Sequence, residues 1–293
     1  IKRLGLTPLT AADMKRFVGV DAAGYVIPYY DLAGKRTGFS RVRFFEPVFL
    51  KKGGKPIRYL QPPRSAPEPY LPPLLSRSKT WAAIAADPTI ELWLTEGEKK
   101  AALLTKLGHP TIGLGGVWSF RSKRQGVELL PALEAFAWAK RSVVIAYDSD
   151  LRVNDDVLMA ERSFARELLR RGAAVAAVAL PDLGPGKTGV DDFIVARGLA
   201  ALDALERTSL EGGDALAALN NELAYVSELD ATLVLATGGL LPEPKLKTRY
   251  ANRTFVSFAD GKPQRVNAAI AWLAWPLRRE VARISYAPGE GRF

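Results

Sequence analysis

Three carboxylates that follow apolar runs are the residues best suited to chemistry in this chain. Glu96 comes after the run at residues 90–95, and Asp148 and Asp150 come after the run at residues 142–147. Magnesium in phosphoryl transfer is usually held by a few carboxylates together with waters and substrate phosphates. We therefore predict that these three acids are catalytic and face a Mg²⁺ or Mn²⁺ ion, with Glu96 either completing the cluster or positioning a reacting hydroxyl.

An alternation of strands and helices from residue 90 onward must bring these acids together. The patterns predict strands at residues 90–95, 111–114, 142–147 and 174–180, and helices at residues 98–107, 129–140 and 155–171. Strands separated by such helices indicate an α/β fold, a parallel sheet with helices on both faces. Because sites in such sheets collect at the carboxyl ends of the strands, we expect Glu96, Asp148 and Asp150 to meet at one edge.

The regions on either side have different patterns. The first eighty residues predict a small, mainly β subdomain with strands at residues 25–30 and 39–45, and the proline-rich stretch at residues 61–74 indicates an extended connector. The last third predicts a small appended module or linker. Its expected elements are helices near residues 214–226 and 267–275 and strands at residues 232–236 and 254–258.

The net charge of +10 is unevenly distributed along the chain. Residues 1–80 hold 15 Lys and Arg against 5 Asp and Glu, residues 81–241 hold 16 against 22, and residues 242–293 hold 10 against 4. A basic flank is commonly just a solvated surface. The alternative is that the two flanks hold a polyanionic nucleic acid over an acidic, metal-requiring centre.

Composition excludes several other classes of site. The 293 residues include no cysteine, which rules out disulfides, zinc ribbons and thiol catalysis. The one histidine, His109, lies in a Gly-His-Pro turn, where a structural role is favoured over a catalytic one. The longest apolar run, at residues 173–180, is too short to span a membrane. We expect a cytoplasmic protein, and a chain that begins at Ile1 is expected to be a fragment of a longer one.

The segments around the three acids resemble the TOPRIM domain of primases and topoisomerases. The resemblance is carried by LWLTEGEKKA at residues 92–101, GLGG at residues 113–116 and VVIAYDSD at residues 143–150. The family places a glutamate after the first strand and Asp-x-Asp after the third, which implies Glu96, Asp148 and Asp150 as its metal-binding acids. Asp191 and Asp192 in KTGVDDFI resemble a further acidic element of phage and plasmid primase relatives, and Glu98 is another candidate acid.

The upstream segments YVIPYYDLAGKRTGFSRVRFF and KPIRYLQPP are similar to the region preceding TOPRIM in DnaG-type primases. That resemblance implies a nucleotide and template channel lined by basic residues and a tyrosine. The candidates are Arg41, Arg43, Lys55, Arg58, Tyr59, Lys99, Lys100 and Lys187. Two departures stand out: a cysteine-based zinc module cannot exist here, and Lys99 and Lys100 lie near where relatives carry another acid.

Together these resemblances imply a DNA primase fragment of the phage or plasmid primase-helicase type. The implied domains are a basic N-terminal subdomain (residues 1–80), a TOPRIM domain (residues 88–200) and a C-terminal module leading to a helicase domain (residues 201–293). Its partners would be single-stranded DNA, nucleoside triphosphates and that helicase domain, with no membrane. Two alternatives remain: a TOPRIM nuclease that uses the same acids, and a non-catalytic nucleic-acid-binding replication module.

Several features also have simpler local explanations. Asp191 lies where an N-cap would lie, and Glu96 precedes a helix whose dipole favours an acid. The sequence at residues 184–188, GPGKT, is similar to a phosphate-binding loop, but Pro181 stands at its first required glycine. Trp272 and Trp275 have the spacing of a helix core stripe, which competes with base stacking as their role.

Overall fold

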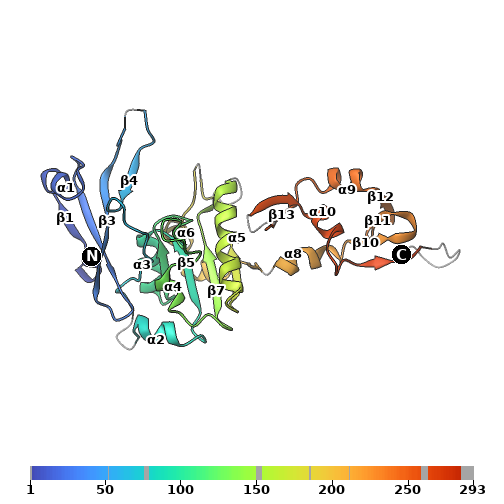
Figure 1. Ribbon diagram of the computed structural model, residues 1–293, viewed down its shortest axis with the longest axis horizontal. Coiled ribbons are helices and arrows are strands. Elements are labelled where there is room, and N and C mark those ends of the chain that lie inside the picture. The colour runs from blue at the N-terminus through green and yellow to red at the C-terminus, as the bar shows by residue number, and fades with distance from the viewer. Residues whose placement is uncertain are drawn as a thin grey trace. The chain divides into compact units, whose positions relative to one another are not determined.

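The computed structural model describes residues 2–51, 53–75, 79–149, 154–184, 186–210, 212–258 and 263–284 (Figure 1). It divides into two compact units, Ile1–Thr208 and Ser209–Phe293, and each is described by itself. Asp150 lies outside the described residues. Among the helices that are described, none combines the length and the apolar character needed to cross a membrane.

A five-stranded sheet forms the centre of the first unit. Its order is β6 (Thr111–Leu114), β5 (Leu92–Glu96), β7 (Ser142–Ala146), β8 (Ala174–Val178) and β9 (Arg207–Ser209). β5 pairs in parallel with β6 and β7, and β7 pairs in parallel with β8. The predicted α/β class and parallel sheet are confirmed. The central strands are apolar, which is typical of parallel strands that are covered by helices on both faces of the sheet.

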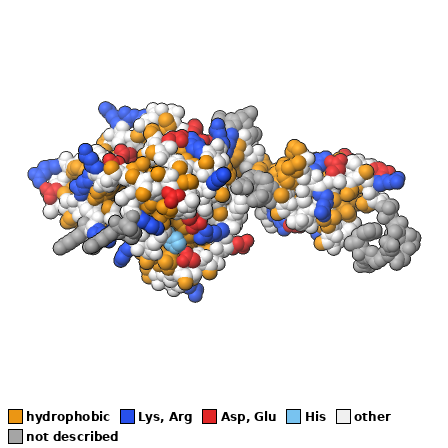
Figure 2. All heavy atoms as spheres, turned by 90° about the horizontal axis from the view of Figure 1, so that it is seen from below, with side chains coloured by type: hydrophobic (Ala, Val, Ile, Leu, Met, Phe, Trp, Pro, Cys, Tyr) orange, Lys and Arg blue, Asp and Glu red, His pale blue; other side chains and the backbone are white. Residues whose placement is uncertain are grey.

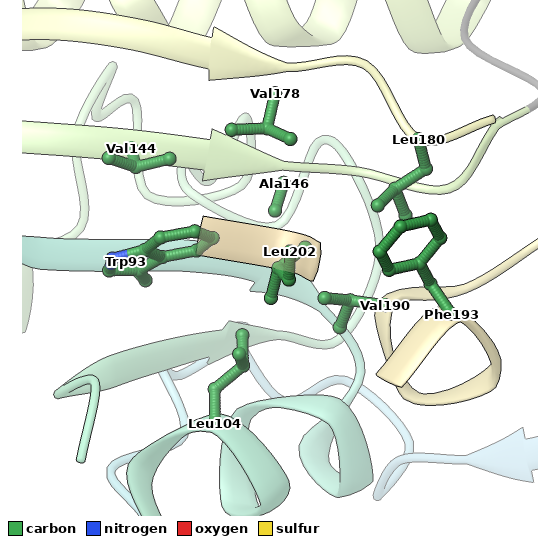
Figure 3. Packing of buried hydrophobic residues seen from close by; sticks show 9 residues of the cluster. All are labelled: Trp93, Leu104, Val144, Ala146, Val178, Leu180, Val190, Phe193 and Leu202. Atoms are coloured by element: carbon green, nitrogen blue, oxygen red, sulfur yellow. The ribbon is translucent and has the colours of Figure 1, made fainter. Parts of the chain in front are cut away.

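Helices cover both faces of this sheet. The described ones are α2 (Trp81–Ala86), α3 (Glu98–Leu107), α4 (Pro131–Glu134), α5 (Asp155–Leu169), α6 (Val190–Arg197) and α7 (Leu199–Asp203). α3 and α5 lie on opposite sides of the strands (Figure 1). Figure 3 shows one core, in which Trp93 and Val144 of the sheet meet Leu104, Phe193 and Leu202 of the helices.

The helix predicted at residues 129–140 is wrong for most of its length, since α4 ends at Glu134. Ala137 N donates to Ala85 O at 2.8 Å, so that amide hydrogen bonds to another segment instead of continuing the helix. Lys140 has a positive φ of 64°, which a helix interior does not allow. Tertiary contacts therefore end the helix before its apolar pattern ends.

Arg141 is a buried cross-link at the start of β7. Its guanidinium is 0% exposed and donates to Ala137 O and Ile90 O at 2.8 Å, to Ile84 O at 2.9 Å and to Ala85 O at 3.0 Å. We expect Arg141→Met to lower the free energy of unfolding by about 3 kcal/mol, because buried carbonyls without a donor cost roughly 1–3 kcal/mol each.

Urea unfolding measures the effect of Arg141→Met. Lys140→Met is the matched control, because it removes the same charge from a neighbouring exposed side chain and is expected to change stability little. Equal unfolding midpoints for the two variants would show that Arg141 does not hold these segments together.

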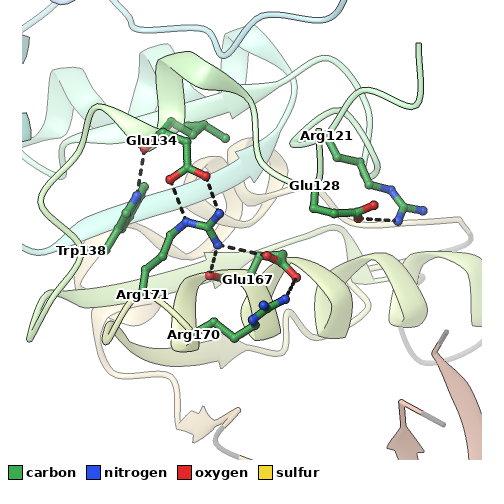
Figure 4. A network of polar contacts seen from close by, with 8 residues as sticks. Arg121, Glu128, Glu134, Trp138, Glu167, Arg170 and Arg171 are labelled. Atoms are coloured by element: carbon green, nitrogen blue, oxygen red, sulfur yellow. Dashed lines mark hydrogen bonds and ion pairs between the residues drawn. The ribbon is translucent and has the colours of Figure 1, made fainter. Parts of the chain in front are cut away.

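A second arginine joins the end of α5 to α4 (Figure 4). Arg171 Nε donates to Glu134 Oε2 at 2.8 Å, and its Nη1 donates to Glu167 Oε2 at 3.0 Å and to Glu167 O at 2.6 Å. Because Glu134 is largely exposed, this pair orients the helices more than it stabilises them.

An antiparallel sheet precedes the parallel one in the same unit. Its order is β1 (Thr7–Leu9), β2 (Gly24–Tyr30), β3 (Arg36–Val48) and β4 (Ile57–Leu60), with a 3₁₀ turn at Lys2–Leu4 and the helix α1 (Ala11–Val18). Met14 of α1 is buried with Val42 and Phe44 of β3, while Ile27 and Tyr29 of β2 are buried with Ala101 of α3. The sheet is therefore fixed directly onto the α/β layer.

The proline-rich stretch is more than the extended connector that was predicted. Tyr70 and Leu71 are buried, and Tyr70 exchanges two backbone hydrogen bonds with Gly113 of β6, at 2.8 and 2.9 Å. A side chain at residue 113 would lie 3.0 Å from the Ala101 side chain, so glycine allows this close approach.

The second unit has its own small core. Its elements are α8 (Gly212–Leu219), β10 (Leu223–Val226), a 3₁₀ turn (Ser227–Leu229), β11 (Ala231–Val234), β12 (Gly239–Leu241), α9 (Glu243–Arg249), β13 (Thr254–Ser257), β14 (Gln264–Asn267), α10 (Ala268–Leu273) and β15 (Glu280–Val281). One sheet has the order β12-β11-β10-β15, and β13 pairs with β14.

Two expectations for this unit are settled by its packing. The helix predicted to reach residue 226 ends at Leu219, because Asn220 turns the chain and its Oδ1 accepts from Trp272 Nε1 at 2.8 Å. Trp272 is fully buried, which makes it a core residue with no face open for stacking on a base.

Candidate active site

A pocket of about 320 Å³ lies where β5, β6 and β7 end. Its lining combines the strands β3 and β4, the end of β5 with the start of α3, the residues after β6 and after β7, and the loop before α6 with the start of α6. The lining residues are Arg41, Tyr59, Glu96, Gly97, Glu98, Lys99, Lys100, Gly115, Asp148, Lys187 and Asp191. Residues from six segments of the sequence therefore share one site.

The structure brings together most of the residues singled out from the sequence. Nine line the pocket: Arg41, Tyr59, Glu96, Glu98, Lys99, Lys100, Asp148, Lys187 and Asp191. Arg43, Lys55, Arg58 and Asp192 are not part of the lining. Asp150 is outside the described residues. The roles given to these residues stay predictions, while the meeting of Glu96 and Asp148 at one pocket is a structural fact.

The basic residues outside the pocket lie on the antiparallel sheet. The Arg43 guanidinium lies over the Tyr59 ring at 5.7 Å and over the Tyr25 ring at 5.9 Å. Arg58 is exposed and donates to Phe45 O at 3.4 Å, and Lys55 is an exposed residue before β4. On the face drawn in Figure 2, basic side chains are interspersed with acidic and apolar ones rather than forming one continuous patch.

Asp148 is a buried carboxylate held by two lysines. It is 3% exposed; Lys100 Nζ bonds its Oδ1, and Lys187 Nζ lies 2.8 Å from its Oδ2. Ser149 N donates to Thr188 O at 3.0 Å, and Thr188 N donates to Ser149 Oγ at 2.9 Å. These bonds hold the segment that carries Lys187 and Thr188 against the chain that leaves β7.

Glu98 is the second buried carboxylate, at 1% exposure. Its Oε1 accepts from Tyr29 Oη at 2.7 Å and pairs with Arg41 Nη1 at 2.6 Å, while its Oε2 has no hydrogen-bond partner among the described residues. Burial, and next the charge of Glu98, raise the pKa of Tyr29 well above its ordinary value. Tyr29 therefore stays a neutral donor to this carboxylate.

Asp191 and Asp192 have different roles from those their positions suggested. α6 begins at Val190 after Gly189, and Asp192 Oδ2 accepts from Gly189 N at 3.0 Å. The N-cap role considered for Asp191 is therefore wrong, because Gly189 is the N-cap residue and Asp192 in the first turn accepts from its amide. Asp191 lines the pocket, and its buried Oδ1 has no hydrogen-bond partner among the described residues.

Sequence reasoning missed Tyr29 and Gly189, and it noted Gly115 only as part of the GLGG turn. Tyr29 is part of the apolar strand pattern, and nothing in that pattern marks it as the donor to Glu98. The two glycines leave room for cations: a Cβ at Gly115 would lie 2.9 Å from Arg41 Nη1, and one at Gly189 would lie 2.7 Å from Lys100 Cε.

The donor set of the pocket has the chemistry that a hard divalent cation needs. Glu96 and Asp148 line it, and the unpartnered oxygens of Glu98 and Asp191 are carboxylate donors of the kind that Mg²⁺ and Mn²⁺ accept. Within the described residues, no group of three or more His, Cys, Asp or Glu side chains is arranged to hold a metal. The pocket therefore offers the kind of ligand atoms that Mg²⁺ and Mn²⁺ bind, and a ligand set that includes Asp150 is taken up under the proposed function.

His109 lies away from this chemistry. Its Nε2 is 3.0 Å from Asp203 Oδ1, and its ring lies 4.9 Å from the Trp93 ring. It is absent from the pocket lining, in agreement with the structural role expected from its turn.

A buried acid outside the pocket lining makes stability depend on pH. Glu161 of α5 is 1% exposed, and burial raises its pKa to about 7. In the unfolded chain its pKa returns toward 4.5, so the folded state holds a proton that the unfolded state releases between these values. Stability from this group is therefore lost as pH rises from about 4.5 to about 7.

Glu161→Gln should remove this dependence. We expect the variant to match the parent near pH 4 and to have the higher melting temperature near pH 8, where the parent must bury a charged carboxylate. Thermal unfolding across this range is the measurement. Parallel curves for parent and variant would show that Glu161 does not titrate in this window.

Comparison with known proteins gives matches to part of the chain. Residues 80–201 match the model of a domain of unknown function, DUF3854. An uncharacterized protein of Picosynechococcus sp. is 27% identical over 218 residues, which are 64% of this chain and 22% of that protein. The chain thus spans about a fifth of the length of this curated relative.

Two solved structures are similar to the chain at low identity. One is the Aquifex aeolicus primase (zinc-binding and RNA polymerase domains), with 19% identity, a TM-score of 0.41, and coverage of 68% of this chain and 43% of that one. The other is the DnaG catalytic core, with 16% identity, a TM-score of 0.44, and coverage of 68% and 57%. What the pocket can do therefore has to follow from its own residues.

Proposed function

We propose that this chain is the catalytic part of a DNA primase of the phage or plasmid type, which joins nucleotides on a single-stranded template. The observation that carries the proposal is the composition of one pocket. It unites Glu96 and Asp148, acids at the ends of two parallel strands, with Arg41 and Tyr59 from the basic antiparallel sheet. A polymerase needs both layers, acids for a metal and cations for phosphates.

In this proposal Glu96, Asp148 and Asp150 hold a Mg²⁺ or Mn²⁺ ion. When bound, the ion supplies positive charge beside the attacked α-phosphate and favours ionisation of the 3′-hydroxyl. Lys187 is half exposed and pairs with Asp148, so it is placed to turn toward a phosphate of the incoming nucleotide. Lys99 is a further nucleotide contact of the same pocket, and Lys100 contributes its positive charge there while it stays paired with Asp148.

The template would lie over the antiparallel sheet. Arg43 with Tyr59 and Tyr25 offers a cation-aromatic surface on which bases can stack, and Lys55 and Arg58 are exposed for phosphate contacts.

We further propose the division into residues 1–80, 88–200 and 201–293, with the last module leading to a helicase domain of a longer cytoplasmic protein.

The test is incorporation of labelled nucleotides on single-stranded DNA with Mg²⁺ or Mn²⁺. Short products that require both template and metal support a primase. Cleavage of single strands without nucleoside triphosphates would instead identify a nuclease that uses the same acids.

A non-catalytic nucleic-acid-binding module is the second candidate. It is favoured by one observation, that both oxygens of Asp148 are already paired with lysines. Tight single-strand binding with no turnover, unchanged in Asp148→Ala, would support that function.

Salt dependence tests the proposed template surface. Each phosphate contact on a single strand contributes a slope of about 0.7 to the fall of log affinity with log salt. We expect Arg58→Met to weaken single-strand binding uniformly across sequences and to reduce that slope by about one contact. Lys15→Met, on α1 and paired with Asp21, is the matched control and should keep the parental slope. If Arg58→Met kept the parental slope, Arg58 would not contact a phosphate of the bound single strand.

A further inference from the structure

The charges of the pocket balance among its described residues. Its lining holds four carboxylates, Glu96, Glu98, Asp148 and Asp191, and four cations, Arg41, Lys99, Lys100 and Lys187. Three of the cations are paired directly with acids, Arg41 with Glu98 and both Lys100 and Lys187 with Asp148. A pocket balanced in this way attracts divalent ions less strongly than one lined by acids alone.

The two lysines on Asp148 differ in how firmly they are held. The Lys100 side chain is 17% exposed and projects from the helix α3, whereas the Lys187 side chain is 52% exposed and lies on the segment between β8 and α6. Lys100 is therefore the fixed partner of Asp148, and Lys187 is the one that can exchange with an incoming ion.

Gly189 provides the room that Lys100 occupies. A Cβ at this position would lie 2.7 Å from Lys100 Cε and 3.1 Å from Lys100 Nζ. The φ of Gly189 is −85°, which any residue can adopt, so its backbone does not require glycine. The same Cβ would lie 2.7 Å from Asp191 Oδ1, so glycine at this position also leaves room for this unpartnered oxygen.

We propose that Lys100 is a resident cation of the pocket, which holds Asp148 in place of a second divalent ion. The inference rests on the proposed metal-dependent function and makes it more specific. Asp148 is buried and needs a counter-charge. Lys100 supplies that charge permanently, so the pocket accepts at most one divalent ion, and this ion competes with Lys187 alone.

The first test counts bound Mn²⁺ by electron paramagnetic resonance of the free ion. Lys100→Glu replaces the ammonium by a third carboxylate beside Asp148 and Asp191, and we expect it to bind one more Mn²⁺ per chain than the parent. Lys106→Glu makes the same charge change at an exposed lysine of the same helix, outside the pocket lining, and is expected to keep the parental number. Two ions in the parent, or no additional ion in a folded Lys100→Glu variant, would overturn the proposal.

The second test follows thermal unfolding in EDTA. Lys100→Met is expected to lower the melting temperature by about 5 °C, because it removes the fixed partner of a buried carboxylate. Added Mn²⁺ should restore part of this loss, while Lys99→Met should unfold like the parent. An unchanged melting temperature in Lys100→Met would show that its ammonium does not hold Asp148.

These measurements separate the inference from the proposed function. If the parent binds no Mn²⁺ and Lys100→Glu binds one ion, Lys100 occupies a cation position as proposed. The same result would contradict the proposed metal-dependent polymerase function. If primer synthesis occurs but Lys100→Glu gains no ion, the polymerase stands and the resident cation is wrong.

Discussion

Replacing Asp148 by asparagine is expected to reduce template-dependent nucleotide incorporation by at least about 100-fold, the scale on which a preorganised charged group acts in catalysis. Asparagine keeps the shape of the side chain but removes its charge and one acceptor oxygen, so it binds a divalent ion much more weakly and cannot neutralise Lys100 and Lys187. Asp150→Ala is expected to cause a comparable loss. The initial rate at saturating Mn²⁺ is the quantity to measure.

Asp182→Asn is the matched control for this prediction. Asp182 is exposed on the segment that also carries Lys187, but it does not line the pocket. We expect it to retain the parental rate. If Asp148→Asn also retained that rate with an unchanged circular dichroism spectrum, Asp148 would have no part in the reaction, and the non-catalytic binding module would be favoured.

The second large effect concerns stability. Arg41→Met is expected to lower the free energy of unfolding by about 3 kcal/mol, because breaking a buried pair leaves an uncompensated charge. Glu98 is 1% exposed, and without the ion pair its carboxylate would keep the hydrogen bond that Tyr29 Oη donates. Urea unfolding of the parent and the variant measures this loss.

A double variant separates the contribution of the ion pair to stability from the contribution of the packing around it. Arg41→Met combined with Glu98→Leu removes both charges and should recover most of the lost stability. Arg43→Met on the same strand is the control, since a cation over aromatic rings contributes only about 1 kcal/mol. Equal losses in Arg41→Met and Arg43→Met would contradict the importance assigned to the buried ion pair.

The α/β layer could be predicted because its signals are local. The apolar runs of β5 and β7 and the glycine that ends α3 at residue 108 belong to the segments they define. Parallel pairing of these strands then requires that Glu96 and Asp148 reach the same edge, as they do. The predictions that were wrong concern elements whose ends depend on distant contacts. One example is α4, after which the amide of Ala137 hydrogen bonds to Ala85 O.

By itself, the sequence determined the class of the fold, the positions of its central strands along the chain and the placing of an acidic site after two of them. Those features follow from hydrophobic periodicity, which acts within a single segment. Only the tertiary structure decided which charges meet. The pairing of Glu98 with Arg41 spans 57 residues and that of Asp148 with Lys100 spans 48. Such pairs depend on how whole elements pack, because a buried charge must find its partner wherever the fold brings one within reach.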